Sequence, residues 1–265
     1  MYPYLLPEVF GYTIPLYDVM IGIGVVAMLF YVINRFEKQD GLSRSQSNRL
    51  LILILFSLLI ALISSYLFDG IFHSLEEGEW SFGTITFIGG LIGGIVTFLI
   101  LLKLFYKEEQ KDVRMMLNTI VAGVALAHAF GRIGCFFAGC CFGIPTESFL
   151  GVFFPFGEAH EIYPGEDVFP TQLFEAAFLF LLFIGLNKIS LLKNRELESY
   201  LIGYGIWRIA IEFIRGDERG ILIPLWETQY NVFPTPSQFM SLIMIILGAY
   251  LVYRHTHKNH THTTV

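Results

Sequence analysis

Seven apolar stretches, each long enough or nearly long enough to cross a bilayer, limit what this chain can fold into. They cover residues 17–34, 50–69, 84–105, 115–137, 173–187, 199–214 and 237–253. A membrane-spanning helix needs about 20 mainly apolar residues, because it must cross a hydrocarbon core about 30 Å thick. Only 15% of the residues are charged, against about 25% in soluble domains. The sequence therefore predicts an all-α integral membrane protein with about seven transmembrane helices.

Lysine and arginine are concentrated in alternate loops of this predicted bundle. The segments 35–49, 103–114, 188–195 and 254–265 hold most of the 17 basic residues, whereas 70–83 and 138–172 hold none. Basic loops stay on the cytoplasmic side, so we expect the N-terminus outside and a cytoplasmic tail at 254–265. The segment 138–172 then forms a small extracytoplasmic cap on a single membrane domain, 1–265.

A histidine, an arginine and a cysteine are spaced along the fourth stretch at intervals that share one helical face. His128, Arg132 and Cys135 stand at i, i+4 and i+7. A membrane arginine is costly and usually faces a bundle interior or a wet cavity. This face can therefore hold an anion beside a proton carrier. The alternative is a structural ion pair, or an arginine that reaches toward the outer headgroups.

The sixth stretch, "YGIWRIAIEFIR", carries a second set of polar residues. We expect Tyr204, Arg208, Glu212 and Arg215 on one helical face, with Arg208 paired to Glu212. The pair alone could serve stability. However, arginines on two separate spans suit a lipid phosphate, because each guanidinium offers two parallel donors and stays charged.

Two further motifs have both a packing and a functional interpretation. Gln172 and Glu175 in "FPTQLFE" can orient substrate hydroxyls or simply begin a helix. "FIGGLIGG" at 87–94 has the glycine spacing of close helix packing.

The three cysteines, Cys135, Cys140 and Cys141, allow several readings. Buried cysteine commonly acts as a small hydrophobe, and a disulfide or a metal site are the alternatives. Because the spacing matches no standard zinc pattern, we expect no metal ion and no cofactor.

Taken together, these motifs resemble the bacterial prolipoprotein diacylglyceryl transferase family, from about residue 84 to 245. "GRIGCFFAGCCFG" resembles the signature that begins G-R-x-G-N-F, and "FPTQLFE" resembles H-P-S-Q-L-Y-E. "YGIWRIAIEFIR" resembles Y-x-x-x-R-x-x-x-E-F-x-R, "FIGGLIGG" resembles H-G-G-L-I-G, and "SQFMSL" resembles G-Q-x-x-S.

The resemblance implies transfer of the diacylglyceryl group of phosphatidylglycerol to the lipobox cysteine of a preprolipoprotein in the bacterial cell membrane. The implied partners are that lipid, the lipobox segment and the bilayer, and nucleic acid is not among them. The expected catalytic residues are His128, Tyr204, Arg208 and Glu212, and the expected lipid-binding residues are Arg132, Gly143, Gln172, Glu175, Arg208 and Arg215.

This chain departs from the family pattern at four positions. Ile88 and Phe169 replace histidines, Cys135 replaces an asparagine and Cys140 an acidic residue. The base that deprotonates the thiol therefore has three candidates, His128, Glu212 and Glu175. The alternatives are a relative that uses another acceptor, and a non-catalytic lipid-binding or transport protein.

Overall fold

The computed structural model describes residues 4–5, 13–77, 87–106, 113–217, 225–228 and 232–261. The chain packs as two compact units, residues 33–116 and residues 1–32 with 117–265, and each unit is described by itself. The expectation of a single domain stays a prediction.

Each of the seven predicted apolar stretches lies largely in a helix, as far as the structure describes its residues. The helices are α1 (Leu16–Lys38), α2 (Arg44–Glu77), α3 (Phe87–Phe105), α4 (Val113–Ala138), α6 (Thr171–Lys188), α7 (Glu196–Glu212) and α8 (Pro236–Thr261). Within the described residues, α1, α2, α4, α6 and α8 are long and apolar enough to cross a membrane. Helix α7 has 17 residues, and the apolar part of α3 covers Ile92–Phe105. The predicted all-α integral membrane class is confirmed.

In the smaller unit, α2 packs against α3 through the glycines of "FIGGLIGG". A side chain at Gly89 would collide with Phe68, and one at Gly93 would collide with Ser64. The prediction of close helix packing is therefore confirmed.

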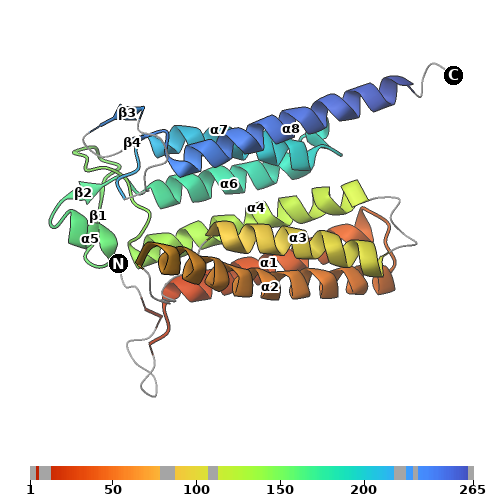
Figure 1. Ribbon diagram of the computed structural model, residues 1–265, viewed down its shortest axis with the longest axis horizontal. Coiled ribbons are helices and arrows are strands. Elements are labelled where there is room, and N and C mark those ends of the chain that lie inside the picture. Colours follow the sequence, from red (N-terminus) through yellow and green to blue (C-terminus); the bar gives the residue numbers. More distant parts are fainter. Residues whose placement is uncertain are drawn as a thin grey trace. The chain divides into compact units, whose positions relative to one another are not determined.

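In the larger unit, α6, α7 and α8 run side by side (Figure 1). Small residues again set the spacing, because a Cβ at Gly205 would lie 2.7 Å from Ile245 of α8. Helix α1 packs on α4 in the same way, since a Cβ at Gly24 would lie 2.8 Å from the carbonyl oxygen of Ala127. Close packing of this kind brings the polar side chains of neighbouring helices within contact distance.

Helix α8 begins with a capping box in "TPSQ", residues 235–238. The backbone N–H of Gln238 donates to the Thr235 hydroxyl at 3.3 Å, and the Thr235 N–H donates to Oε1 of Gln238 at 3.2 Å. Pro236 occupies the first helical position, where its missing N–H costs nothing. This local sequence fixes where α8 starts, beside the polar end of α7.

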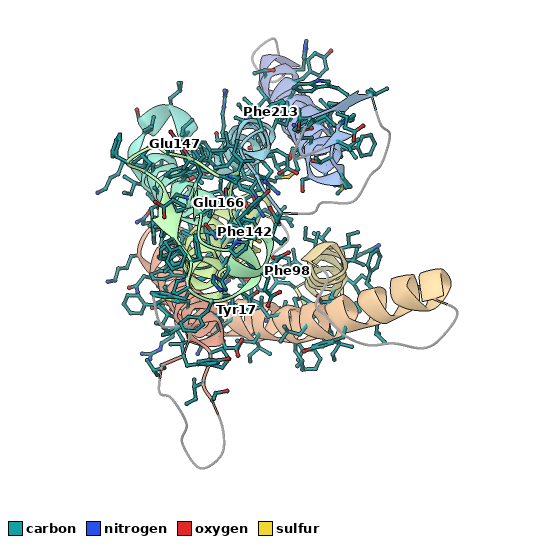
Figure 2. All side chains as sticks on the ribbon, turned by 90° about the vertical axis from the view of Figure 1, so that its left-hand side faces the viewer. Tyr17, Phe98, Phe142, Glu147, Glu166 and Phe213 are labelled. Carbon is teal, nitrogen blue, oxygen red and sulfur yellow. The ribbon has the colours of Figure 1, made fainter. Side chains whose placement is uncertain are left out.

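The segment between α4 and α6 folds into a small cap. Strand β1 (Val152–Phe153) pairs antiparallel with β2 (Asp167–Val168), Val152 opposite Val168, and α5 (Glu158–Ile162) lies between them in the chain. Phe142 is fully buried in its core, whereas Glu147 and Glu166 are exposed (Figure 2). The prediction that this cap, residues 138–172, lies outside the cytoplasm stays a prediction.

A short turn and a pair of short strands also belong to the larger unit. The 3₁₀ turn η2 (Ser190–Leu192) joins α6 to α7. Strands β3 (Trp226–Glu227) and β4 (Val232–Phe233) pair antiparallel before α8, with Trp226 opposite Phe233. The Phe233 ring stacks there on both Phe213 and Trp226, with ring centroids 5.1 and 5.0 Å apart.

Candidate active site

Glu175 of α6 is the centre of a buried polar cluster that joins three helices. Its side chain is fully buried. One carboxylate oxygen accepts the Tyr204 hydroxyl of α7 at 2.7 Å, and the other lies 3.0 Å from Nε of Arg132 on α4. His128, one turn before Arg132, approaches Glu175 at 3.9 Å, and its ring meets the Tyr204 ring edge to face at 5.1 Å. Four predicted site residues from α4, α6 and α7 thus meet at one point.

A second cluster lies one turn further along α7. NH1 of Arg208 is 2.7 Å from Oε2 of Glu212, which confirms the predicted i, i+4 pair. NH2 of Arg208 donates to the Ser237 hydroxyl at 3.0 Å, and the Thr235 hydroxyl donates to Oε1 of Glu212 at 2.6 Å. The start of α8 therefore holds both members of the pair.

Each arginine side chain retains some exposure while its carboxylate partner has none. The side chain of Arg132 is 14% exposed and that of Arg208 is 8% exposed, whereas Glu175 and Glu212 are completely enclosed. An enclosed carboxylate at ion-pair distance restrains its guanidinium by charge attraction, which solvent screens little at a buried site. The remaining N–H donors can then contact an anion that enters from the open side, without first being reoriented.

Arg215 does not continue this helical face, and that expectation was wrong. Helix α7 ends at Glu212, and the chain turns so that Arg215 forms an isolated β-bridge with Gly143 of the cap. Its fully buried guanidinium makes a bidentate ion pair with Asp217. Nε donates to Oδ1 at 2.8 Å and NH2 donates to Oδ2 at 2.7 Å. Although burial acts in the opposite direction, the hydrogen bonds to Asp217 and the Asp217 charge hold the pKa of Arg215 above its ordinary value.

Gly143 is enclosed by backbone. A Cβ there would lie 2.7 Å from the Ile214 carbonyl oxygen and 2.8 Å from that of Phe169. Its N–H donates to the Phe169 carbonyl at 2.8 Å. The structure thus gives Gly143 and Arg215 contacts that join the cap to the end of α7, and their predicted contacts with substrate stay predictions.

Two residues at the start of α6, Thr171 and Gln172, bind the loop that carries Cys140 and Cys141, here called the cysteine loop. Nε2 of Gln172 donates to the Cys140 carbonyl at 2.6 Å, and the Thr171 hydroxyl donates to the Cys141 carbonyl at 2.7 Å. Sequence reasoning missed this role, and also missed Thr235, Ser237 and Asp217 as partners. The match of "SQFMSL" to a family segment was the available signal for the start of α8.

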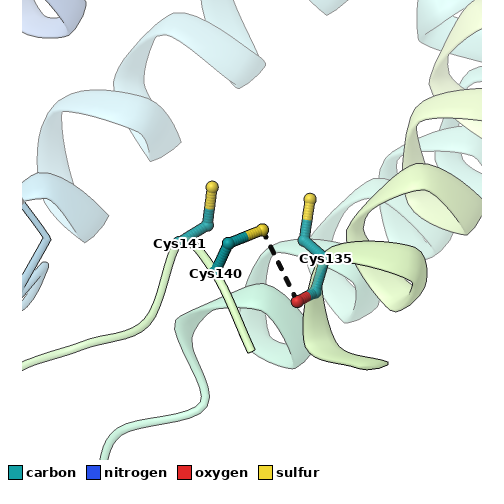
Figure 3. Close-up of side chains that lie close together, drawn as sticks. All are labelled: Cys135, Cys140 and Cys141. Atoms are coloured by element: carbon teal, nitrogen blue, oxygen red, sulfur yellow. Dashed lines mark hydrogen bonds between the residues drawn. The ribbon is translucent and has the colours of Figure 1, made fainter. Parts of the chain in front are cut away.

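The three cysteines are free and half-buried, and their sulfurs lie within 4.8 Å of one another (Figure 3). The disulfide alternative is therefore not realised. Hydrogen bonds from Cys135 and Cys140, with the charges of Arg215 and Arg132, hold the pKa of the Cys141 thiol well below its ordinary value. Hydrogen bonding to Cys135 and Cys141, together with burial, raises the pKa of Cys140.

Known proteins match this chain over almost its whole length. The family model of prolipoprotein diacylglyceryl transferase matches residues 5–254. A phosphatidylglycerol–prolipoprotein diacylglyceryl transferase of Clostridium tetani is 32% identical, over 92% of this chain and 94% of its own. A second, from Clostridium perfringens, is 31% identical over 94% of this chain and 93% of its own. One from Dehalococcoides mccartyi is 26% identical over 90% and 88%. The chain therefore belongs to the prolipoprotein diacylglyceryl transferase family.

Proposed function

We propose that this protein transfers the diacylglyceryl group of phosphatidylglycerol to the thiol of a lipobox cysteine in a preprolipoprotein, in the bacterial cell membrane. The names of its relatives state this activity for those proteins. The observation that carries the proposal to this chain is a pair of ion-paired arginines, Arg132 and Arg208, on different helices of one family-matched unit.

The reaction needs charge stabilisation at the phosphate and deprotonation of the thiol. The sulfur attacks the glyceryl carbon that bears the phosphate, a C–S bond forms and the C–O bond to the phosphate breaks. The bonding electron pair leaves with glycerol phosphate, and the thiol proton passes to a base. Arg132 and Arg208 bind the phosphate oxygens through their planar guanidinium groups. Because they are held by Glu175 and Glu212, they are preorganised for the charge that develops on the leaving group.

Among the three candidate bases, we favour His128. Glu175 is ion-paired with Arg132 and Glu212 with Arg208, so each carboxylate already neutralises an arginine. His128 lies one turn before Arg132 on the same face of α4, and a neutral imidazole can accept a proton from a thiol. His128→Gln should therefore slow transfer strongly at pH 7 and less at pH 9, where the acceptor thiol ionises unaided. An unchanged rate and pH profile would exclude His128 and favour the carboxylates.

The activity is tested with purified protein, labelled phosphatidylglycerol and two lipobox peptides that differ by Cys or Ser at the acceptor position. We expect a thioether product, identified by mass spectrometry, on the Cys peptide alone. Arg132→Lys should abolish most transfer because lysine keeps the positive charge but cannot make the bidentate contact of a planar guanidinium. Arg44→Lys, at an exposed position, is the matched control. Label on another acceptor would identify a relative with different specificity, and binding of the lipid without turnover would identify a lipid-binding protein.

We further propose that the N-terminus lies outside the membrane and the C-terminus in the cytoplasm, as the distribution of basic residues predicts. Ser45 and Glu161 are both exposed and are placed on opposite sides by this orientation. In a variant whose native cysteines are replaced by serine, Glu161→Cys should react with an impermeant maleimide on intact cells, and Ser45→Cys should react only after lysis. The reverse pattern would contradict the orientation.

A further inference from the structure

The cysteine cluster is a group of nucleophilic side chains that the transfer mechanism above does not use. Cys135 lies in the last turn of α4, and Cys140 and Cys141 follow a turn at Gly139. Figure 3 shows the three side chains gathered together, with the Cys140 thiol directed to the Cys135 carbonyl at 3.7 Å. All three sulfurs lie within 4.8 Å of one another.

Packing alone does not account for this arrangement. Cys141 has a φ of +64°, and a left-handed conformation at a residue other than glycine costs about 1–3 kcal/mol. The loop is nevertheless held in place, because Gln172 and Thr171 bind the carbonyls of Cys140 and Cys141. A disulfide could join only two of the three thiols and would leave the third.

The geometry fits a thiophilic metal ion. Thiolates select Zn²⁺ and Cu⁺. With Zn–S bonds of about 2.3 Å, sulfurs around zinc lie about 3.8 Å apart, so the cluster needs a contraction of about 1 Å or less, within reach of small side-chain rotations. Three thiolates around Zn²⁺ carry one excess negative charge. Arg132, one turn before Cys135, and Arg215, whose charge acts on Cys141, supply positive charge nearby.

We infer that Cys135, Cys140 and Cys141 bind a Zn²⁺ ion through three thiolates and leave its fourth coordination position for the thiol of the acceptor cysteine. Within the described part of the chain, no fourth His, Cys, Asp or Glu side chain joins the cluster. Three protein ligands with an open position are the arrangement of catalytic zinc sites. The half-buried sulfurs leave such a position accessible.

The role of this ion as a thiol activator rests on the proposed function. Zinc deprotonates a thiol that coordinates it, which is the step for which the family histidines are missing at Ile88 and Phe169. The acceptor thiol would displace water from zinc and release its proton to His128 or to solvent. The bound sulfur then forms the C–S bond as the C–O bond to phosphate breaks. The cluster is joined to the Glu175 site through α4 and α6, since Cys135 follows Arg132 and Gln172 precedes Glu175 by one turn each.

The metal site is tested by spectroscopy on the full chain, purified under reducing conditions and stripped with a chelator. Titration with Co²⁺ should give a sulfur-to-cobalt charge-transfer band that saturates at an equimolar amount of metal and disappears when Zn²⁺ is added. Cys135→Ser, Cys140→Ser and Cys141→Ser should each weaken or abolish the band, and the triple variant should lose it. If the wild type binds Co²⁺ and Zn²⁺ no more tightly than the triple variant, the inference is overturned.

The fourth position is tested by adding lipobox peptides to the cobalt-loaded protein. The Cys peptide should intensify the charge-transfer band and the Ser peptide should leave it unchanged, and Arg132→Lys should retain this response while losing transfer. If the charge-transfer band does not change when the Cys peptide is added, the assignment of the fourth zinc position to the acceptor thiol is overturned. Unimpaired transfer by metal-free protein overturns the zinc role but leaves the proposed function standing. A normal cobalt response without transfer to any lipobox peptide contradicts the proposed function instead.

Discussion

Replacing Glu175 with glutamine should destabilise the larger unit through the charge left on Arg132. Glutamine keeps the volume of glutamate and can still accept the Tyr204 hydroxyl with one oxygen. Its amide NH₂ group would then face Nε of Arg132, where the carboxylate oxygen now lies at 3.0 Å. Breaking a buried ion pair by removing one partner costs about 3–5 kcal/mol. At about 2–4 °C per kcal/mol for a chain of this size, the thermal midpoint should fall by roughly 6–20 °C.

The midpoint is measured by heating the detergent-solubilised protein and quantifying the folded fraction by size-exclusion chromatography. Glu227→Gln, in an exposed strand, is the matched control, and its effect should stay within about 0.5 kcal/mol. Arg132→Gln combined with Glu175→Gln should cost less than the two single changes added together, because neither charge is then left alone. An unchanged midpoint for Glu175→Gln, or strict additivity in the double variant, would refute the buried pair.

Three further substitutions test the second cluster and the junction of cap and helix. Arg208→Lys should keep membrane insertion but reduce transfer at least about 100-fold, measured with labelled phosphatidylglycerol, because a compact ammonium cannot reproduce the planar, spread donors with which Arg208 contacts Glu212 and Ser237 and can still face a phosphate. Gly143→Ala should lower the free energy of unfolding by about 1–3 kcal/mol, seen in the thermal midpoint, because its Cβ meets backbone that cannot move aside. Asp217→Asn should lower the thermal midpoint by removing the negative charge that faces the buried guanidinium of Arg215, and should leave the KM for the lipid unchanged. A raised KM with normal stability would instead make Arg215 a lipid contact.

The helices and one ion pair could be predicted from the sequence because both depend on local spacing. Apolar stretches of spanning length specify helices in a membrane, and Arg208 and Glu212 stand one turn apart on the same helix. The end of α7 could not be predicted in this way. The apolar pattern continues through Phe213 and Ile214, and the helix stops where the Ile144 N–H donates to the Ile214 carbonyl. That bond comes from the cap, far away in the sequence.

The ion-pair partner of Arg132 could likewise not be predicted from residue spacing. Glu175 lies 43 residues after Arg132 in the chain. A helical wheel gives the face on which each residue lies but does not tell which helices are neighbours. The gathering of the three cysteines has the same origin, since it depends on a left-handed residue at Cys141 and on carbonyl contacts from α6. Each of these features is set by packing between elements.

The anchoring of the cysteine loop by its carbonyl oxygens has an evolutionary consequence. Thr171 and Gln172 recognise the main chain of Cys140 and Cys141, and every amino acid presents the same carbonyl there. The loop can therefore keep its path while the side chain at Cys140 is exchanged, whereas the φ of +64° at Cys141 disfavours β-branched residues there. The chemistry at position 140 can therefore change without redesigning the scaffold, which makes this loop a suitable place to build libraries of variants.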